Sequence, residues 1–284
     1  MNNYDTILKL LKKKFKTEDS NYLNEYHLKT IESNLFFEPY DGIDERANSI
    51  RSSAAMIYNT IGPYGIILDG KKYSHIEYER EFPALNNKDK SDHDHSAHLD
   101  VSMLSEDGFE FLLIEAKCLE WMDLSLDNPK SCNKAYLSEY CYREESKNVF
   151  STFRESFLSL LKTPRKINPK YKNSYLPSRK RYDAIQMNIH ILGIYNYCAR
   201  KEEKIPSKIR LLNIVWDYDE AEEYQTEEQE GKEYVAFANV TFRNLFESLG
   251  VDFSVEYVRY SDFLKRVDWS NDLEHRVYLK RYEI

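Results

Sequence analysis

Glycine and long apolar runs are both scarce in this chain, which has eight glycines among 284 residues. So few glycines favour a helix-containing fold with few flexible stretches. Residues 1–16 form an amphipathic stretch with five lysines and lack the long apolar run of a signal peptide or membrane helix. We therefore expect a cytoplasmic protein that makes no contact with a membrane.

Cysteine is also rare, and its four copies show neither the close pairing of a zinc site nor the density of a disulfide scaffold. We expect reduced, mostly buried thiols at these positions, and no structural zinc. The four residues are Cys118, Cys132, Cys141 and Cys198.

A positive net charge is missing as well: the chain carries −8 at pH 7, whereas binding to nucleic-acid phosphates needs a basic surface. The distribution of charge removes this conflict. Between Asp217 and Glu233 nine acids stand against one base, a local sum of −8, which leaves the rest of the chain neutral. The average charge therefore excludes no nucleic-acid function.

A basic segment lies between Ser156 and Tyr182, where eight bases occur without an acid and are interleaved with tyrosines. Such a segment is suited to gripping phosphates non-specifically while its tyrosines pack on sugars or bases. A merely solvated loop is an equally good interpretation, because three prolines argue against regular structure. The bases are Lys162, Arg165, Lys166, Lys170, Lys172, Arg179, Lys180 and Arg181.

The hydrophobic content of 42% is enough to build a core, and no internal repeat or obvious linker divides the sequence. We expect an N-terminal helical extension over residues 1–40, followed by one decorated domain over residues 41–284 with an acidic loop over residues 217–233.

Hydrophobic periodicity predicts an α/β arrangement of helices and strands. A helix is expected from Asp44, its N-cap, to Ile61, with Gly62 and Pro63 ending it. Three strands are expected next, over residues 73–82, 98–104 and 110–119, the last two joined by a turn at Asp107-Gly108. Later patterns predict helices over residues 133–161, 182–201 and 235–249, and strands over residues 209–216 and 253–258.

One Glu-x-Lys triplet stands out among four in the sequence, because only Glu115 and Lys117 interrupt an apolar strand. Burying a carboxylate and an ammonium group costs several kcal/mol unless they serve a partner or a metal. Side chains alternate along a strand, so Glu115 and Lys117 point to the same side, and the hairpin can bring Asp100 beside them.

Two neighbouring carboxylates repel each other, and a hard divalent cation such as Mg²⁺, or Mn²⁺, relieves that repulsion. Asp100 and Glu115 are the expected ligands, with the Ala116 carbonyl as a candidate third. The metal would activate a water, while Lys117 would hold that water or help to deprotonate it, which suits phosphodiester hydrolysis. The alternative is a structural role: Asp100 is an acid at a strand end or turn, and Glu115 and Lys117 form an ion pair on one face of a half-exposed strand.

The segment His98-Leu99-Asp100-Val101, a turn, and then Leu113-Ile114-Glu115-Ala116-Lys117 resembles the D…ExK core of the restriction-endonuclease-like, or PD-(D/E)XK, nuclease superfamily. Looser matches at residues 51–59, 76–79 and 186–190 resemble, in order, segments of a bacterial family of predicted restriction endonucleases. The resemblance covers residues 44–216. It implies an αβββαβ core with a central mixed sheet flanked by helices, Mg²⁺ dependence and a DNA substrate, and it leaves the acidic loop unexplained.

The resemblance also implies further site residues. An acid on the first core helix often joins the site in this superfamily, which suggests Glu45, with Glu79 on the first strand as its competitor. The plainer alternatives are that Glu45 favours a helix N-terminus and that Glu79 faces solvent. Gln186 and His190, one helical turn apart, resemble a glutamine-bearing helix that faces the site, although such a pair often only satisfies a polar spot.

A histidine cluster at His93, His95 and His98 has the composition of a transition-metal site, but a solvated loop over residues 86–96 is the favoured interpretation. His98 is the member expected to touch substrate phosphate. The residues expected to bind nucleic acid are therefore His98, Gln186, His190, Lys166, Lys170, Lys172, Arg179, Lys180 and Arg181.

These expectations describe a Mg²⁺-dependent endonuclease acting on DNA, with a homodimer as its candidate assembly and with restriction or another nucleic-acid defence role following by analogy only. One alternative is a catalytically silent nucleic-acid-binding or interaction module of the same fold, whose acidic loop binds a partner or mimics DNA. Another is a nuclease that acts on RNA or branched DNA.

Overall fold

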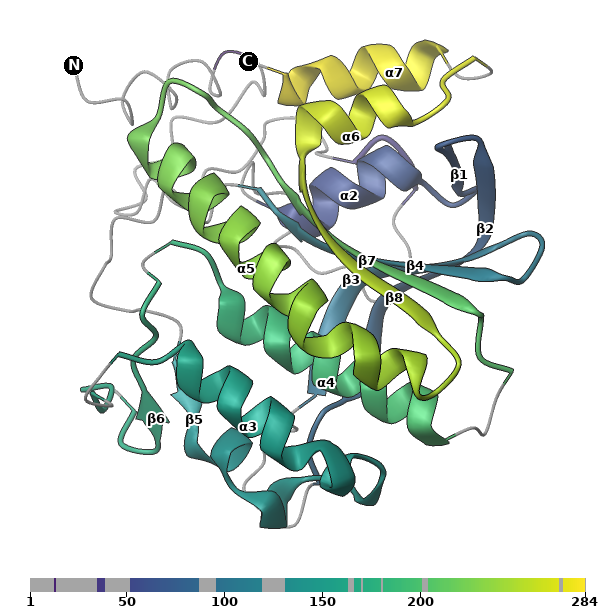
Figure 1. Ribbon diagram of the computed structural model, residues 1–284. Coiled ribbons are helices and arrows are strands. Elements are labelled where there is room, and N and C mark those ends of the chain that lie inside the picture. The colour runs from purple at the N-terminus through teal and green to yellow at the C-terminus, as the bar shows by residue number, and fades with distance from the viewer. Residues whose placement is uncertain are drawn as a thin grey trace.

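The computed structural model describes residues 13, 35–38, 52–86, 96–118, 131–162, 166–169, 171–179, 181–200, 204–270 and 273–283. A curled, mixed sheet of six strands runs through its centre in the order β1-β2-β3-β4-β7-β8, with helices on both faces (Figure 1). The α/β class is therefore confirmed. The strands are β1 Ile66–Leu68, β2 Lys71–Pro83, β3 Ser96–Ser105, β4 Glu110–Lys117, β7 Lys208–Val215 and β8 Asp252–Arg259.

The first four strands form an antiparallel meander, and β4, β7 and β8 are parallel. Tight turns make two of the connections in this meander: Asp69 and Gly70 lead from β1 to β2, and Gly108 from β3 to β4, all three with positive φ. The expected three-strand meander and its Asp-Gly turn are thus confirmed, with β1 as an additional short strand.

The connection from β4 to β7 carries most of the helical layer on one face. It contains a small two-stranded sheet and a series of short helices before the long helix α4, and parallel pairing needs such a crossover. Its elements are β5 Cys132–Asn133, η4 Lys134–Leu137, η5 Glu139–Cys141, η6 Glu144–Val149, α3 Phe150–Ser159, β6 Ser174–Tyr175 and α4 Ala184–Arg200.

Side chains of β4 alternate between two cores. Leu112 and Ile114 pack with α2 (Ser53–Ile61), α6 (Tyr260–Arg266), α7 (Leu273–Leu279) and η7 (Lys280–Tyr282). Phe111 and Leu113 pack on the opposite side with α3, α4 and α5 (Glu222–Glu247). Continuing this alternation, Glu115 and Lys117 face the α4 side of the sheet.

Strand β3 is irregular at Asp100. Leu99 and Val101 are two residues apart, yet they pack into opposite cores, which a regular strand would not allow. The neighbouring strand is irregular at the same level, because Glu79 has a φ of 52°. Pairing of β3 with β4 also stops here, at Val101↔Ile114. Asp100 therefore sits where β3 separates from β4.

The first expected helix is shorter than its periodicity suggested. Helix α2 begins at Ser53, because Ser52 has an extended backbone and its hydroxyl accepts the Ala55 N–H at 3.0 Å as an N-cap. As expected, the helix ends at Gly62. The Gly62 N–H donates a hydrogen bond to the Tyr58 carbonyl. Asp44 and nearly all of residues 1–40 lie outside the described residues, so the N-terminal extension stays a prediction.

The acidic loop expected over residues 217–233 is wrong from Glu222 onward, because α5 spans Glu222–Glu247. Its buried positions recur at helical spacing, so most of the acids are carried on the outer faces of a continuous helix. These positions are Tyr224, Glu227, Gly231, Tyr234, Ala238, Phe242 and Phe246. The many charged residues in this segment made the helical spacing of its buried positions difficult to recognise in the sequence.

Other differences are smaller. The single helix expected over residues 133–161 is divided into three 3₁₀ turns followed by α3, and the short helices α6 and α7 follow β8 without having been predicted. Cys118, Cys132 and Cys198 are buried free thiols and Cys141 is partly buried, as expected. Across the described ranges, no helix combines the length and apolar character needed to cross a membrane.

Candidate active site

Asp100 and Glu115 lie at the point where β3 and β4 separate. The last cross-strand pair is Val101↔Ile114, so one further step in the same register places Asp100 opposite Glu115. Beyond that pair, the backbone pairing between β3 and β4 ends, and the Ala116 N–H donates to a side chain, Asp100 Oδ2, at 2.6 Å. The backbone of β4 thereby holds the Asp100 carboxylate beside the Glu115 position.

Glu115, Lys117 and Gln186 form a closed triangle of polar contacts. Lys117 Nζ lies 2.5 Å from Glu115 Oε1 and donates to Gln186 Oε1 at 2.9 Å. Gln186 Nε2 donates to Glu115 Oε1 at 2.7 Å. Gln186 stands in the first turn of α4, where its own N–H is capped by Asp183 Oδ1 at 3.0 Å. The expectation that Gln186 faces the Glu115–Lys117 pair is therefore confirmed.

His190 lies one turn further along α4, behind Glu115. Its Nε2 is 3.1 Å from Glu115 Oε2, and the side chain is completely buried. Neither ring nitrogen completes a well-formed hydrogen bond to a described residue. Because no part of the ring reaches the surface, His190 contacts Glu115 and is not placed to touch a nucleic acid, which corrects that expectation.

The two carboxyl groups differ in acidity. Burial and the negative charge of Glu115 raise the pKa of Asp100 well above its usual range, against the opposing effects of Lys117 and the Ala116 N–H. Burial acts the same way on Glu115, but the charges of Lys117 and His190 outweigh it and lower its pKa. Glu115 is therefore firmly ionised, and Asp100 is the member of the pair that more readily holds a proton.

The oxygen donors at this point suit a small, hard cation. The N–H and C=O of one strand residue point to the same edge, so the Ala116 carbonyl faces the β3 edge, as its N–H does. Mg²⁺ needs only one or two carboxylates and completes its shell with water and phosphate oxygens. Asp100, Glu115 and the Ala116 carbonyl meet that need. No cluster of three or more His, Cys, Asp or Glu side chains able to hold a metal occurs in the described part of the chain.

Of the two candidates for an additional acid, only Glu79 is among the described residues. It is exposed and lies opposite Asp100, between the register pairs Tyr78↔Val101 and Arg80↔Leu99. Its negative charge adds to the effects that raise the pKa of Asp100. His98 is exposed nearby, with Nδ1 3.4 Å from the Glu79 carbonyl. Glu45, like His93 and His95, lies outside the described residues.

The basic and acidic segments, which appeared independent in the sequence, contact each other. Glu230 on α5 accepts the N–H groups of Arg181 and Tyr182 through Oε2, at 2.9 and 3.0 Å. The Arg179 Nε donates to the Glu230 carbonyl at 3.3 Å. These contacts hold the residues just before α4. Lys166 and Lys172 are exposed in the segments around β6, and Lys170 and Lys180 are not described.

Asn213 was not identified from the sequence as a site residue. It lies beside Glu115 in the parallel β4–β7 register, and its Nδ2 donates to the Glu115 carbonyl at 3.1 Å. The available signal was the same one that marked Glu115: a single polar residue in the apolar run Leu211-Leu212-Asn213-Ile214-Val215. Burying an uncharged amide costs less than burying a charged group, so this signal is weaker than the one at Glu115.

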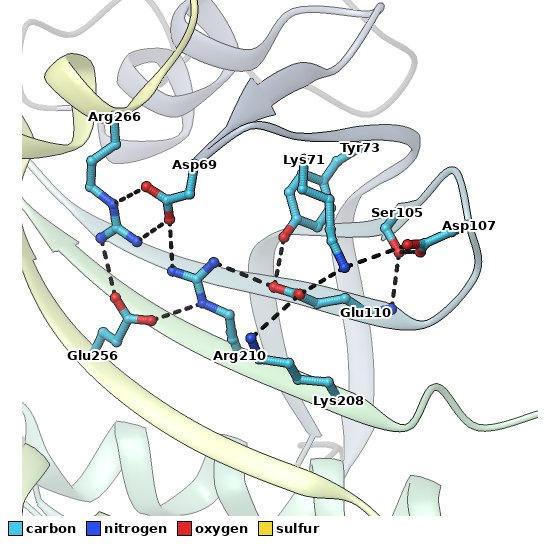
Figure 2. A network of polar contacts seen from close by, with 10 residues as sticks. All are labelled: Asp69, Lys71, Tyr73, Ser105, Asp107, Glu110, Lys208, Arg210, Glu256 and Arg266. Carbon is cyan, nitrogen blue, oxygen red and sulfur yellow. Dashed lines mark hydrogen bonds and ion pairs between the residues drawn. The ribbon is translucent and has the colours of Figure 1, made fainter.

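A second group of charged residues on the central strands has a different character (Figure 2). Arg210 on β7 is buried and donates to Glu256 at 2.8 Å, to Asp69 at 3.2 Å and to Glu110 at 3.3 Å. Tyr73 donates to the same Glu110 oxygen at 2.6 Å. Opposite charges are matched throughout this network, so its evident role is to join the β1–β2 turn, β2, β4, β7 and β8. An apolar strand context alone therefore does not mark a catalytic charge.

Comparison of the chain with protein-family models, with curated proteins and with solved structures found no match in any of the three. The case for a function consequently depends on the geometry at Asp100, Glu115 and Lys117.

Proposed function

We propose that the chain is a Mg²⁺-dependent endonuclease that hydrolyses phosphodiester bonds of DNA, with Mn²⁺ able to replace Mg²⁺. The observation that carries the proposal is the convergence of Asp100, Glu115 and Lys117, joined by Gln186 from α4, at the point where β3 leaves β4. In the network around Arg210, by contrast, hydrogen bonds and cationic neighbours lower the pKa of both Asp69 and Glu110, whereas the pKa of Asp100 is raised.

The order of elements supports the same proposal. Helix α2, strands β2, β3 and β4, helix α4 and strand β7 follow one another as in the αβββαβ core of the PD-(D/E)XK superfamily. In this proposal, Asp100 on the second of these strands and Glu115 and Lys117 on the third would correspond to the D…ExK residues, and Gln186 to the glutamine of the second helix. Membership of that superfamily, and a role in restriction or nucleic-acid defence, stay part of the proposal.

Each residue has a distinct task in this mechanism. The carboxylates of Asp100 and Glu115 and the Ala116 carbonyl would hold Mg²⁺, which when bound acidifies a coordinated water and neutralises charge on the phosphate. Lys117 orients the attacking water through its ammonium group. Gln186 holds the Lys117 and Glu115 side chains in place through its hydrogen bonds with both. Water adds to phosphorus, the bond to the leaving sugar oxygen breaks, and that oxygen takes up a proton.

Binding of the substrate would depend on cationic side chains around this point. Arg181 lines the cavity beside Lys117, and His98 is exposed next to Glu79. Arg179, Lys166 and Lys172 would add contacts to the phosphate backbone, which position a nucleic acid without reading its sequence. The expected homodimer remains a prediction that light scattering of the purified protein can check.

The test is cleavage of plasmid, linear DNA and RNA by the purified full chain in Mg²⁺ or Mn²⁺, with the variants Asp100→Ala and Lys117→Ala. Each variant should lower the rate by about 10²-fold or more, because it removes a group that acts on the reacting atoms. Lys147→Ala, from the exposed look-alike triplet Glu145-Ser146-Lys147, should cleave like the wild type.

Three results would change the proposal. Cleavage that survives both substitutions would exclude the mechanism. Cleavage of RNA or of branched DNA alone would assign the same chemistry to a different substrate. Binding without cleavage in either metal would favour a silent nucleic-acid-binding module.

A further inference from the structure

A small cavity lies beside Lys117, between residues of β4, β7, α4 and α5. Its volume is about 10 Å³, which is the space that one water molecule needs. Donors and acceptors both face it. Its polar lining comes from Lys117, Arg181, Tyr182, Asp183, Gln186, Asn213 and Glu227.

Asn213 presents an unpaired acceptor at this cavity. The side chain is only 2% exposed. Its Nδ2 donates a hydrogen bond to the Glu115 carbonyl, which can only accept one. That contact fixes which end of the amide carries the oxygen. Oδ1 is left buried and without a hydrogen bond to any described residue.

Tyr182 presents a second unpaired polar atom. Its hydroxyl is buried and forms no hydrogen bond within the described ranges. The residue cannot simply turn away, because its N–H is held by Glu230 and its ring packs against Tyr234 and Tyr257. Buried polar groups in native proteins are almost always satisfied, often by an ordered internal water.

We propose that this cavity binds one ordered water, which hydrogen-bonds Asn213 Oδ1 and the Tyr182 hydroxyl beside the Lys117 ammonium group. The lining supplies what a water uses: Asn213 and the carboxylates accept, Tyr182 and Lys117 donate. A metal ion is the poorer occupant, because Lys117 and Arg181 line the same small space. A neutral water avoids that repulsion.

The water would make Asn213 and Tyr182 positioning residues for Lys117. Lys117 is already held by Glu115 and Gln186. The water in the cavity would be a further neighbour of Lys117, so that its ammonium group keeps one place while substrate binds. This second step rests on the proposed nuclease function, whereas the presence of the water does not.

The presence of the water is tested without any activity measurement. A crystal structure at high resolution should show a density peak within about 3 Å of both Asn213 Oδ1 and the Tyr182 oxygen. Tyr182→Phe should lower Tm by about 2–4 °C, because the water loses a partner. Tyr64→Phe, which removes the hydroxyl of an exposed tyrosine, should leave Tm unchanged.

An empty cavity in the crystal, together with an unchanged or raised Tm for Tyr182→Phe, would overturn the proposal, since it would show that the hydroxyl is unpaired. The proposed nuclease function would be unaffected by that result. Conversely, a bound water in a protein that cleaves no substrate would uphold the water site and dismiss its catalytic use.

Positioning of Lys117 is tested on the cleaving enzyme with Tyr182→Phe and with Asn213→Leu, which has similar volume. Both should lower kcat by about 10- to 100-fold and leave KM nearly unchanged, as removal of a residue that orients a catalytic group does. An unchanged kcat in both folded variants would mean that the water is structural only and would reject the positioning role.

Discussion

Asp100 faces Glu115 across the end of the β3–β4 ladder, and the two carboxyl groups have pKa values shifted in opposite directions. Burial raises the pKa of both groups, but at Glu115 the contacts with Lys117 and His190 outweigh it, whereas at Asp100 the negative charge of Glu115 adds to it. Such a pair is poised for a cation, which would compensate the repulsion that raises the pKa of Asp100.

Asp100→Asn should weaken binding of Mn²⁺ by at least about tenfold, because it removes one of two charged ligands. Isothermal titration of the metal into the folded protein measures this directly. The exposed Asp252→Asn should bind Mn²⁺ like the wild type. Equal affinity in all three proteins would show that the metal does not bind through Asp100.

His190→Leu should destabilise the protein by about 1–3 kcal/mol, because the buried Glu115 carboxylate loses a neighbour that stabilises its charge. Urea unfolding at pH 7 gives the free energy, and His75→Leu at an exposed position is the matched control. If both variants are as stable as the wild type, the contact between His190 and Glu115 contributes nothing.

Glu228 should make stability dependent on pH in the acid range. Its two oxygens accept from Arg259 at 2.5 and 2.7 Å, and this pairing lowers the pKa of Glu228 to about 2. A carboxyl whose pKa falls on folding stabilises the protein above its unfolded pKa of about 4.3, and that contribution is lost as the pH drops towards 2. Allowing for solvent at this partly exposed pair, it amounts to about 1–2 kcal/mol at pH 7.

The measurement compares Glu228→Gln with the wild type by urea unfolding at pH 7, 4 and 3. The difference in unfolding free energy should shrink as the pH falls, because the wild type loses the charge that the variant never had. The exposed Glu247→Gln should show only a small difference at every pH. A difference for Glu228→Gln that stays constant from pH 7 to pH 3 contradicts the assignment.

Arg210→Met should destabilise the protein by about 3–5 kcal/mol, because it leaves Glu110 buried with its charge poorly matched. Adding Glu110→Gln to Arg210→Met should recover part of the loss, since the uncompensated charge is then gone. Chemical unfolding of the single and double variants measures both effects. Activity per folded molecule should stay at the wild-type level, which separates this network from the charges at Glu115 and Lys117.

Much of the candidate site followed from local patterns. Alternation along one strand was enough to place Glu115 and Lys117 on the same face. The contact of Gln186 with both residues was suggested only by the resemblance to a glutamine-bearing helix that faces the site. The Asp107-Gly108 turn identified the hairpin that brings β3 back along β4. The alternation along the strand and the turn both depend on residues close in the sequence, so both could be predicted from the sequence.

Contacts between distant segments were out of reach of the sequence. Glu230 and Arg181 belong to segments that looked like separate charged loops, and the charge pattern of α5 hid the apolar spacing that makes it a helix. Asn213 and Tyr182 come together at the cavity only because β7 pairs with β4 and α5 packs beside α4. Propensity and periodicity carry no information about such pairings.

For the cluster of Asp100, Glu115 and Lys117, the sequence by itself determined the types of residue, their strands and the common face of the last two. The tertiary structure decided that Asp100 lies opposite Glu115, through the irregularity at Asp100 and Glu79 and the end of the ladder at Val101↔Ile114. It also decided that His190 is buried behind Glu115. The physical reason is that alternation along a strand is a local property of the backbone, whereas register and burial follow from the packing of the whole sheet against its helices.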